Sequence, residues 1–292
     1  MANGEQTRAA MAAQPDWLRA VSTDRRFPDA RLLFTGCGTS FHAAQTGGDA
    51  VQALELVLSP RREADVLVCV SHEGETALTL EAARAWPGES WLITGKAASP
   101  LAEACDEVVV CTRSIEESWC HTASYTSAVA AIASLSGEDI AWLPAAVEGA
   151  LAAPPVAVSD HDRWLVAGAG RDWPTAQEAV LKLREGAHVA AEAYETEQLL
   201  HGHLAAVDGA VRAFVLEGEG RAADRGRQAV AALQAIGTDV TLVPTRHPVV
   251  DIVQFQRLTV DLAELRGVDP DRIRRDDERW AAAAAAAQTS LD

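Results

Sequence analysis

Two groups of polar residues are spaced so that they could carry out acid–base chemistry. Glu178, Lys182 and Glu185 stand at positions i, i+4 and i+7, which share one face of an α-helix. The chain contains two lysines and many arginines, so an exposed ion pair could easily have used arginine. This spacing indicates a catalytic lysine between two carboxylates, and a solvated ion-pair face is the alternative. A second group predicts an acid–base cluster around Gly202: Glu192, Glu195, Glu197, His201 and His203.

The residues between these polar groups predict how the first of them is held. Small and aliphatic side chains recur at helical spacing and form a stripe that would pack against a core. The stripe comprises Ala176, Ala179, Val180, Leu183 and Ala187. The segment 176–203 is therefore the element that we expect the rest of the chain to position.

Composition restricts the class of protein. The 292 residues are 48% hydrophobic and 23% charged, which is typical of a folded protein with one large core or two ordinary ones. A net charge of −17 argues against nucleic acid and anionic membranes as partners. There is no signal peptide pattern and no run of 18 apolar residues. Five cysteines without a CxxC pair indicate reduced, buried thiols, a cytoplasmic location and no zinc site.

The order of predicted elements indicates an α/β fold that occurs twice. A helix over 5–22, broken by Pro15, precedes a strand at 31–34 and the turn Gly36-Cys37-Gly38. Such a turn attracts anions at a helix N-terminus. Residues 163–171 repeat this strand and Gly-x-Gly turn. Further strands are expected at 65–70, 91–94, 107–111, 213–216 and 240–243, and further helices at 76–86, 101–104, 124–135, 224–236 and 253–266.

These elements predict two domains, each with a parallel sheet flanked by helices. Residues 143–158, which include Pro154 and Pro155, are interpreted as a linker between the domains. The first domain is expected to span residues 1–155 and the second residues 156–292.

Seven segments resemble one known family, the SIS (sugar isomerase) domain proteins. They are Gln14-Pro15, Cys37-Gly38-Thr39-Ser40, Ser71 to Thr76, Thr122 to Thr126, Gly168 to Glu185, His201-Gly202 and Gly267-Val268-Asp269-Pro270. Within this family, the chain resembles the isomerase half of glucosamine-6-phosphate synthase and the stand-alone aminosugar-phosphate deaminases and fructosamine deglycases. We expect the amidotransferase half of the synthase to be absent, because the chain begins at the isomerase-type N-terminus.

The resemblance implies roles for individual residues. Glu185 matches the base that moves a proton between C1 and C2 of an open-chain sugar, and Lys182 matches a lysine that stabilises the enediolate oxygen. His201 matches the residue that opens the sugar ring, typically from a neighbouring subunit, which implies a homodimer or larger assembly. The resemblance also implies that phosphate is bound by hydroxyls and N–H groups at Thr39, Ser40, Ser71 and Thr76. His72, Glu73, Trp119 and Glu178 complete the expected substrate-binding set.

Departures from the family pattern leave two interpretations open. His72 and Glu73 replace a glutamine and a serine of the phosphate loop, Ala123 replaces a lysine, and the C-terminal tail offers arginines instead of the expected lysine. His203 replaces a proline, and Gln198 replaces a glutamate. A carboxylate about 4 Å from a phosphate dianion is repelled by several kcal/mol at an effective dielectric constant of about 20. Either the anion site is rebuilt for hydroxyls or an amine, or the protein binds a sugar without converting it.

The family's catalytic residues all survive, which favours an enzyme. We expect aldose–ketose isomerisation of a sugar or aminosugar, phosphorylated or not, or release of an amine from one, through an open-chain enediol or enediolamine. No metal or other cofactor is expected, because proton transfer on an open-chain sugar requires only positioned acids and bases. A non-catalytic sugar sensor or scaffold protein is the alternative.

Overall fold

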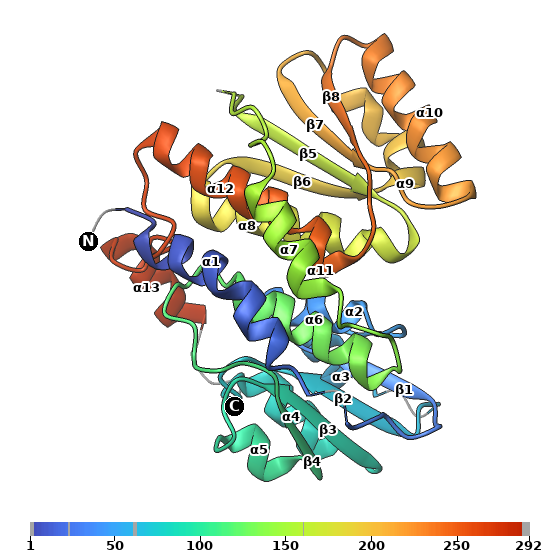
Figure 1. Cartoon of the computed structure of the whole chain (residues 1–292), viewed down its shortest axis with the longest axis vertical. Helices are drawn as coiled ribbons and strands as arrows, with labels where there is room; N and C mark the ends of the chain where they lie inside the picture. Colours follow the sequence, from blue (N-terminus) through green and yellow to red (C-terminus); the bar gives the residue numbers. More distant parts are fainter. Residues whose placement is uncertain (1–2, 23, 61–62, 160, 288–292) are drawn as a thin grey trace.

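The computed structural model describes residues 3–22, 24–60, 63–159 and 161–287. Two four-stranded parallel sheets lie at opposite ends of the long axis, and a layer of helices fills the space between them (Figure 1). Further helices cover the outer face of each sheet, where two smaller apolar clusters are buried. The expected fold, two α/β units with parallel sheets flanked by helices, is confirmed.

The first sheet has the order β1-β2-β3-β4. The elements of the first half are α1 (Glu5–Arg19), β1 (Leu32–Thr35), α2 (Thr39–Gln45), α3 (Ala53–Leu58), β2 (Val66–Val70), α4 (Ala77–Ala85), β3 (Glu89–Thr94), α5 (Pro100–Ala104), β4 (Glu107–Val110), α6 (Ala123–Leu135) and α7 (Leu143–Ala152). Every residue of β2 is buried, as expected for an apolar strand inside a parallel sheet with helices on both faces.

The second sheet has the order β6-β5-β7-β8. The second half comprises β5 (Arg163–Gly168), the 3₁₀ helix η1 (Gly170–Asp172), α8 (Trp173–Ala187), β6 (Ala190–Glu195), α9 (Thr196–Leu200), the 3₁₀ helix η2 (His203–Ala206), β7 (Val211–Leu216), α10 (Arg221–Ala235), β8 (Asp239–Val243), α11 (Pro248–Asp251), α12 (Val253–Arg266) and α13 (Glu278–Ala287).

The two sheets repeat one topology. In the second, β5 lies between β6 and β7. In the first, a parallel bridge joins Phe34 of β1 to Ala50, so the segment around Ala50 occupies the place that β6 has beside β5. In each half the chain therefore leaves its first strand toward one side and then returns to the other side.

Helix α6 is the centre of the main core. All 13 of its residues are buried, and many of them are alanine or serine, which lets neighbouring elements approach closely. Its apolar cluster includes Phe34 and Val68 from the first sheet and Val166 and Phe214 from the second. The two halves thus share one core, and the boundary near Pro155 remains a prediction.

Pro15 does not break the first helix, contrary to expectation. Helix α1 continues from Glu5 to Arg19 with Pro15 inside it. A proline removes the N–H that would bond to the carbonyl four residues earlier. Here the side-chain amide of Gln14 donates to that carbonyl, on Met11, over 3.1 Å. The lost backbone bond is thereby replaced.

The expected linker over 143–158 is wrong for its first two thirds, which form α7. Pro144 occupies the first turn of this helix, where no intrahelical N–H bond is lost. Leu143 and Val147, spaced one turn apart, are buried against the shared core. All five cysteines are free thiols, although Cys37 and Cys105 are only partly buried.

Helix α8 follows β5 and is packed on nearly all sides. Ala176, Ala179, Leu183 and Ala187 have no exposed surface, so the predicted apolar stripe is confirmed. Gly186 lets α12 pass close by, because a Cβ at this position would lie 2.4 Å from the Thr259 methyl group. Among the described residues, no helix is long and apolar enough to cross a membrane.

Candidate functional site

A cavity of about 980 Å³ opens at the carboxyl ends of β1 and β2. Its walls come from the turn Cys37 to Ser40, the loop Ser71 to Thr76, the segment around Trp119 and the end of α8 at Glu185. The chain leaves β1 to one side and continues in β2 on the other, so this is a topological switch point. Ligands of open α/β sheets bind at such points.

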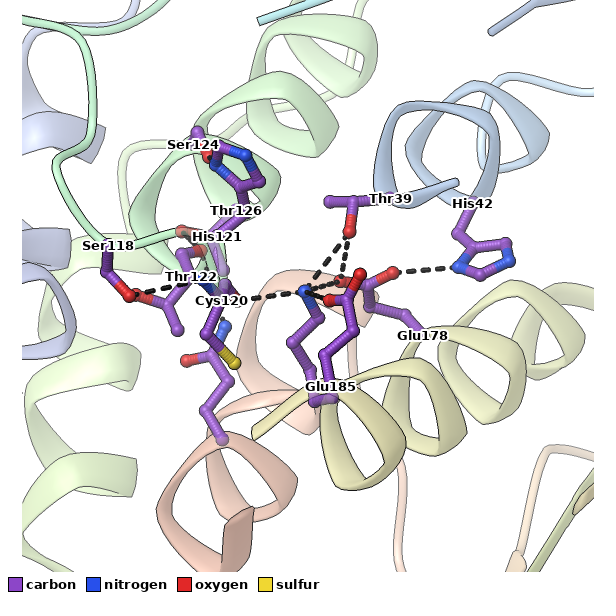
Figure 2. A network of polar contacts seen from close by, with 12 residues as sticks. Thr39, His42, Ser118, Cys120, His121, Thr122, Ser124, Thr126, Glu178 and Glu185 are labelled. Atoms are coloured by element: carbon purple, nitrogen blue, oxygen red, sulfur yellow. Dashed lines mark hydrogen bonds and ion pairs between the residues drawn. The ribbon is translucent and has the colours of Figure 1, made fainter. Parts of the chain in front are cut away.

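A buried ammonium group lies beneath one end of the cavity. Lys182 has no exposed surface, which excludes the solvated ion-pair alternative. Its Nζ donates to the carbonyl oxygen of Cys120 at 2.8 Å, to Glu185 Oε2 at 2.9 Å and to Thr39 Oγ1 at 3.1 Å. Glu178 Oε1 is 3.3 Å away. Figure 2 shows these groups converging from α8, α2 and the segment before α6.

Glu178 holds the other side of this network. Its Oε2 accepts a hydrogen bond from His42 Nδ1 at 2.7 Å, and its Oε1 accepts one from Thr39 Oγ1 at 3.2 Å. The carboxylate is wholly buried and does not line the cavity. The structure therefore places Glu178 behind Thr39, where it can orient Thr39 and Lys182.

Opposite charges keep both buried groups ionised. Burial by itself raises the pKa of Glu178, but Lys182 and His42 outweigh it and hold this pKa below its usual value. Burial by itself lowers the pKa of Lys182, and the carboxylates of Glu178 and Glu185 reverse this, so its pKa lies above the usual value. Lys182 is thus an ammonium ion at neutral pH.

Glu185 connects this network to the cavity. Its side chain retains 28% of its exposure and lines the cavity wall, while Oε2 is held by Lys182. The second oxygen makes no hydrogen bond within the described part of the chain. A carboxylate fixed through one oxygen and open through the other is well placed to accept a proton.

Another part of the cavity wall is formed by the loop after β2. Ser71 Oγ lies 3.2 Å from Thr76 Oγ1 and accepts a hydrogen bond from the Gly74 N–H. Gly74 has a φ of +69°, and a Cβ there would lie 2.1 Å from Ser99 Oγ, so only glycine fits. Glu73 lines the cavity beside this turn.

Two histidines of this wall are neutral at physiological pH. The imidazole rings of His72 and His121 meet edge to face at 5.5 Å. Burial lowers the pKa of His72, and it lowers the pKa of His121 to about 4. His72 Nε2 accepts the Glu116 N–H at 3.0 Å, so the neutral ring carries its proton on Nδ1.

Glu116 is a supporting residue that sequence reasoning missed. Its carboxylate is buried and accepts four hydrogen bonds of 2.7–2.9 Å, two each from Thr122 and Ser124 at the start of α6. The group therefore caps α6 and fixes the segment that carries Trp119 and His121. The local signal in the sequence is a glutamate, Glu116, that precedes Thr122 and Ser124 at the start of an apolar helix. This order and spacing differ from those of the capping box, in which Ser or Thr stands three residues before Glu or Gln.

Trp119 is held by the chain beyond α12. The guanidinium of Arg275 lies 3.5 Å from the centre of the Trp119 ring, and both residues line the cavity. The Trp119 N–H donates to the Asp271 carbonyl, while the Asp271 carboxylate accepts the N–H groups of Gln6 and Thr7 at the start of α1. The Gly267 to Pro270 motif thus leads into a junction between both ends of the chain.

The structure does not bring His201 to this cavity. The side chain is 70% exposed, and its Nε2 lies 2.7 Å from Glu197 Oε1. The predicted cluster around Gly202 is spread over β6, α9 and η2, where His203 stacks on Tyr194, and none of its members lines the cavity. The remaining expected residues Thr39, Ser40, Ser71, His72, Glu73, Thr76 and Trp119 all line it.

Comparisons with known proteins agree with this arrangement. The glutamine–fructose-6-phosphate aminotransferase (isomerizing) of Pyrococcus horikoshii is 26% identical over 84% of this chain and 50% of its own length. The C-terminal domain of the Francisella tularensis glucosamine-fructose-6-phosphate aminotransferase superimposes with a TM-score of 0.79 at 21% identity, covering 91% of this chain and 97% of that one. The resemblance to the SIS domain family is therefore confirmed.

Other solved structures share this fold. The Thermotoga maritima glucosamine-6-phosphate deaminase has a TM-score of 0.74 at 19% identity and covers 92% of this chain and 97% of its own. The Escherichia coli tagatose-6-phosphate ketose/aldose isomerase has a TM-score of 0.75 at 16% identity and covers 92% and 95%. No protein-family model matches the chain. This chain spans about half the length of the curated relatives that it matches.

Proposed function

We propose that the chain interconverts the aldose and ketose forms of a sugar or aminosugar, with Glu185 as the base. The observation that carries this proposal is the position of Glu185, which lies on the cavity wall in contact with a buried ammonium group. The activities for which the relatives are named also support it: aminotransfer with isomerisation, deamination of an aminosugar phosphate, and ketose/aldose isomerisation.

The reaction needs one proton to move between adjacent carbons. The free oxygen of Glu185 removes the C2 proton of an open-chain aldose, the C2–H electron pair forms a C1–C2 double bond, and the aldehyde oxygen takes a proton from water to become an enediol hydroxyl. Glu185 then returns its proton to C1, and the C2 hydroxyl gives its proton to the hydroxide left by that water, which yields the ketose. Release of an amine from C2 proceeds through the corresponding enediolamine and consumes one water molecule, with ammonia leaving.

Lys182 supports this step through Glu185. All three of its N–H groups are engaged, by Thr39, Cys120 and Glu185. To stabilise an enediolate oxygen, as the family resemblance implies, the ammonium must release one of these partners when substrate binds. In the structure described, Lys182 is a positioning residue, and its direct contact with substrate stays a prediction.

His201 as the ring-opening residue requires a second subunit. Within one chain it lies outside the cavity, so the proposal assigns it to the cavity of a partner in a homodimer or larger assembly. Its high exposure leaves the imidazole accessible for such a contact.

The test of Glu185 is proton exchange with solvent. Glu185→Gln keeps the size of the side chain and removes the base, so deuterium incorporation at C1 or C2 and turnover should fall together by about 10²- to 10⁴-fold. The exposed Glu103→Gln on α5 serves as control and should retain both. Undiminished exchange in the Glu185→Gln variant would discard the base assignment.

A sugar-binding protein without turnover is the second candidate. The exposed position of His201 favours it, and one solved structure with the same fold, from Salmonella typhimurium, is named a putative sugar binding protein (TM-score 0.63, 20% identity, covering 90% of this chain and 94% of that one). Thermal-shift screening separates the two, since a sensor is stabilised by a sugar that it never converts.

A further inference from the structure

Glu73 is a carboxylate of the cavity wall that the proposed reaction does not use. It lines the same cavity as Glu185, on the loop that contains Gly74 and Ser71. Among the described residues it has neither a hydrogen bond nor an ion pair. A carboxylate that the protein leaves without a partner in a cavity is available to accept hydrogen bonds from a ligand.

The positive charges near Glu73 are already committed. Lys96 lies 2.5 Å from Glu75, and this pair is solvent-exposed. Arg275 is the only arginine or lysine on the described cavity wall, and its guanidinium stacks on Trp119.

The two histidines add no positive charge at neutral pH. Both His72 and His121 are neutral, and His72 is locked by the Glu116 N–H. Three carboxylates, those of Glu73, Glu75 and Glu81, line the cavity, and Lys96 offsets part of their charge. A sugar phosphate carries a charge close to −2 at pH 7 and meets repulsion here.

The groups that remain suit hydrogen-bond donors on the ligand. Ser71 Oγ and Thr76 Oγ1 stand 3.2 Å apart and can each accept or donate, while a carboxylate such as that of Glu73 can only accept. We propose that the cavity takes an unphosphorylated sugar whose end distant from the reacting carbons carries a hydroxyl or an ammonium group bound by Glu73. This inference rests on the proposed function, because the assignment of Glu185 as the base defines which end of the sugar reacts. It adds the class of substrate to that function.

Binding measured without turnover tests the inference separately from catalysis. We would use calorimetry on the Glu185→Gln full-length chain with three probes: fructose, 6-amino-6-deoxyfructose and fructose 6-phosphate. The unphosphorylated sugars should bind at least about tenfold more tightly than the phosphate, a difference of about 1.4 kcal/mol. Stronger binding of the amine than of the hydroxyl identifies an ammonium as the preferred donor, and equal binding identifies the hydroxyl.

Substitution of Glu73 then assigns the selectivity to this residue. Glu73→Gln, which keeps the shape, and Glu73→Ser should each raise affinity for the phosphate at least tenfold and weaken binding of the 6-amino sugar by a similar factor. Glu103→Gln, which removes an exposed carboxylate on α5 that does not line this cavity, should change this ratio less than twofold. Circular dichroism and melting temperature verify folding of each variant.

Three results would overturn the inference: tighter binding of the phosphate by the Glu73-containing chain, no binding of any probe at millimolar concentration, or equal effects of the Glu73 and Glu103 substitutions. The failure of the proposed catalysis would look different. In that case the Glu185→Gln chain binds the unphosphorylated probes selectively, but the chain with Glu185 restored shows no proton exchange.

Discussion

Lys182 Nζ and Glu185 Oε2 are 2.9 Å apart, and the first group is wholly buried while the second borders the cavity. Because a buried cation can hold a carboxylate in one orientation at little conformational cost, this contact explains how a side chain at the end of a helix can be fixed for catalysis. Lys182 therefore contributes both to the stability of the fold and to the proposed chemistry.

Replacement of Lys182 should therefore destabilise the protein severely. Lys182→Met leaves buried Glu178 without its main counter-charge, and the free energy of unfolding should fall by about 3–5 kcal/mol in urea denaturation. The chain provides its own control, since its other lysine, Lys96, forms an exposed ion pair. Lys96→Met should leave the denaturation midpoint nearly unchanged. Equal effects of the two substitutions would show that the buried network is not as described.

Asp251 should make the fold less stable as the pH rises toward neutrality. Burial, aided by nearby Asp172 and opposed by the Arg246 N–H and Arg171, raises the pKa of Asp251 from 3.8 to about 7. Between these values the folded protein holds a proton that the unfolded chain has released, so stability is greatest at low pH and is lost up to pH 7. The loss attributable to Asp251 is at most about 4 kcal/mol.

Asp251→Asn removes this titration, and its unfolding free energy should vary less between pH 4 and pH 7 than that of the unsubstituted chain. Asp261→Asn on α12 provides a control in the same region and should keep the original pH dependence. Denaturation at several pH values measures both. An unchanged pH dependence in Asp251→Asn would show that this carboxyl group is ionised throughout the range.

Glu116 should prove to be the residue that orders the cavity wall before α6. Glu116→Gln can no longer accept hydrogen bonds through both carboxylate oxygens, so two of the four bonds from Thr122 and Ser124 are lost. We expect a loss of about 1–3 kcal/mol in unfolding free energy. The amide hydrogens of Thr122 and Ser124 should also exchange faster with solvent, whereas the exposed neighbour Glu117→Gln should change neither. Protection that persists in Glu116→Gln would show that α6 is capped without it.

The elements that the sequence predicts correctly are those specified by local pattern. The buried valines of β2 and the apolar stripe of α8 follow directly from periodicity, because sheets and helices with covered faces require such residues. The spacing of Glu178, Lys182 and Glu185 likewise indicates one helical face. Family resemblance adds the loops Thr39-Ser40 and Ser71 to Thr76, which the structure brings to one cavity.

The elements that sequence reasoning misses depend on contacts made elsewhere. Pro15 remains inside α1 because the Gln14 side chain replaces the lost hydrogen bond. Helix propensities are assigned to single residue types, so they do not include a hydrogen bond from a neighbouring side chain. Strand β6 carries charged residues on an exposed edge, so Glu192 and Glu195 suggested an acid–base cluster instead of a strand. Glu116 acts across six to eight residues of irregular chain. The position of His201 relative to another subunit lies beyond what one chain can show.

Complementation between subunits should decide the role of His201. If its imidazole serves the cavity of a partner, a mixed dimer of Glu185→Gln and His201→Asn chains contains one cavity with both groups intact. Random exchange of subunits in an equal mixture of two inactive variants then restores about a quarter of the original activity, since half of the dimers are mixed and each has one complete site. A mixture of Glu185→Gln with the double variant serves as control, because no cavity in it contains Glu185. Two outcomes would exclude a role for His201 across subunits: no recovery of activity after mass spectrometry has verified subunit exchange, or a chain that is monomeric and active. Proton transfer to the sugar ring would then have to come from a group on the cavity wall itself.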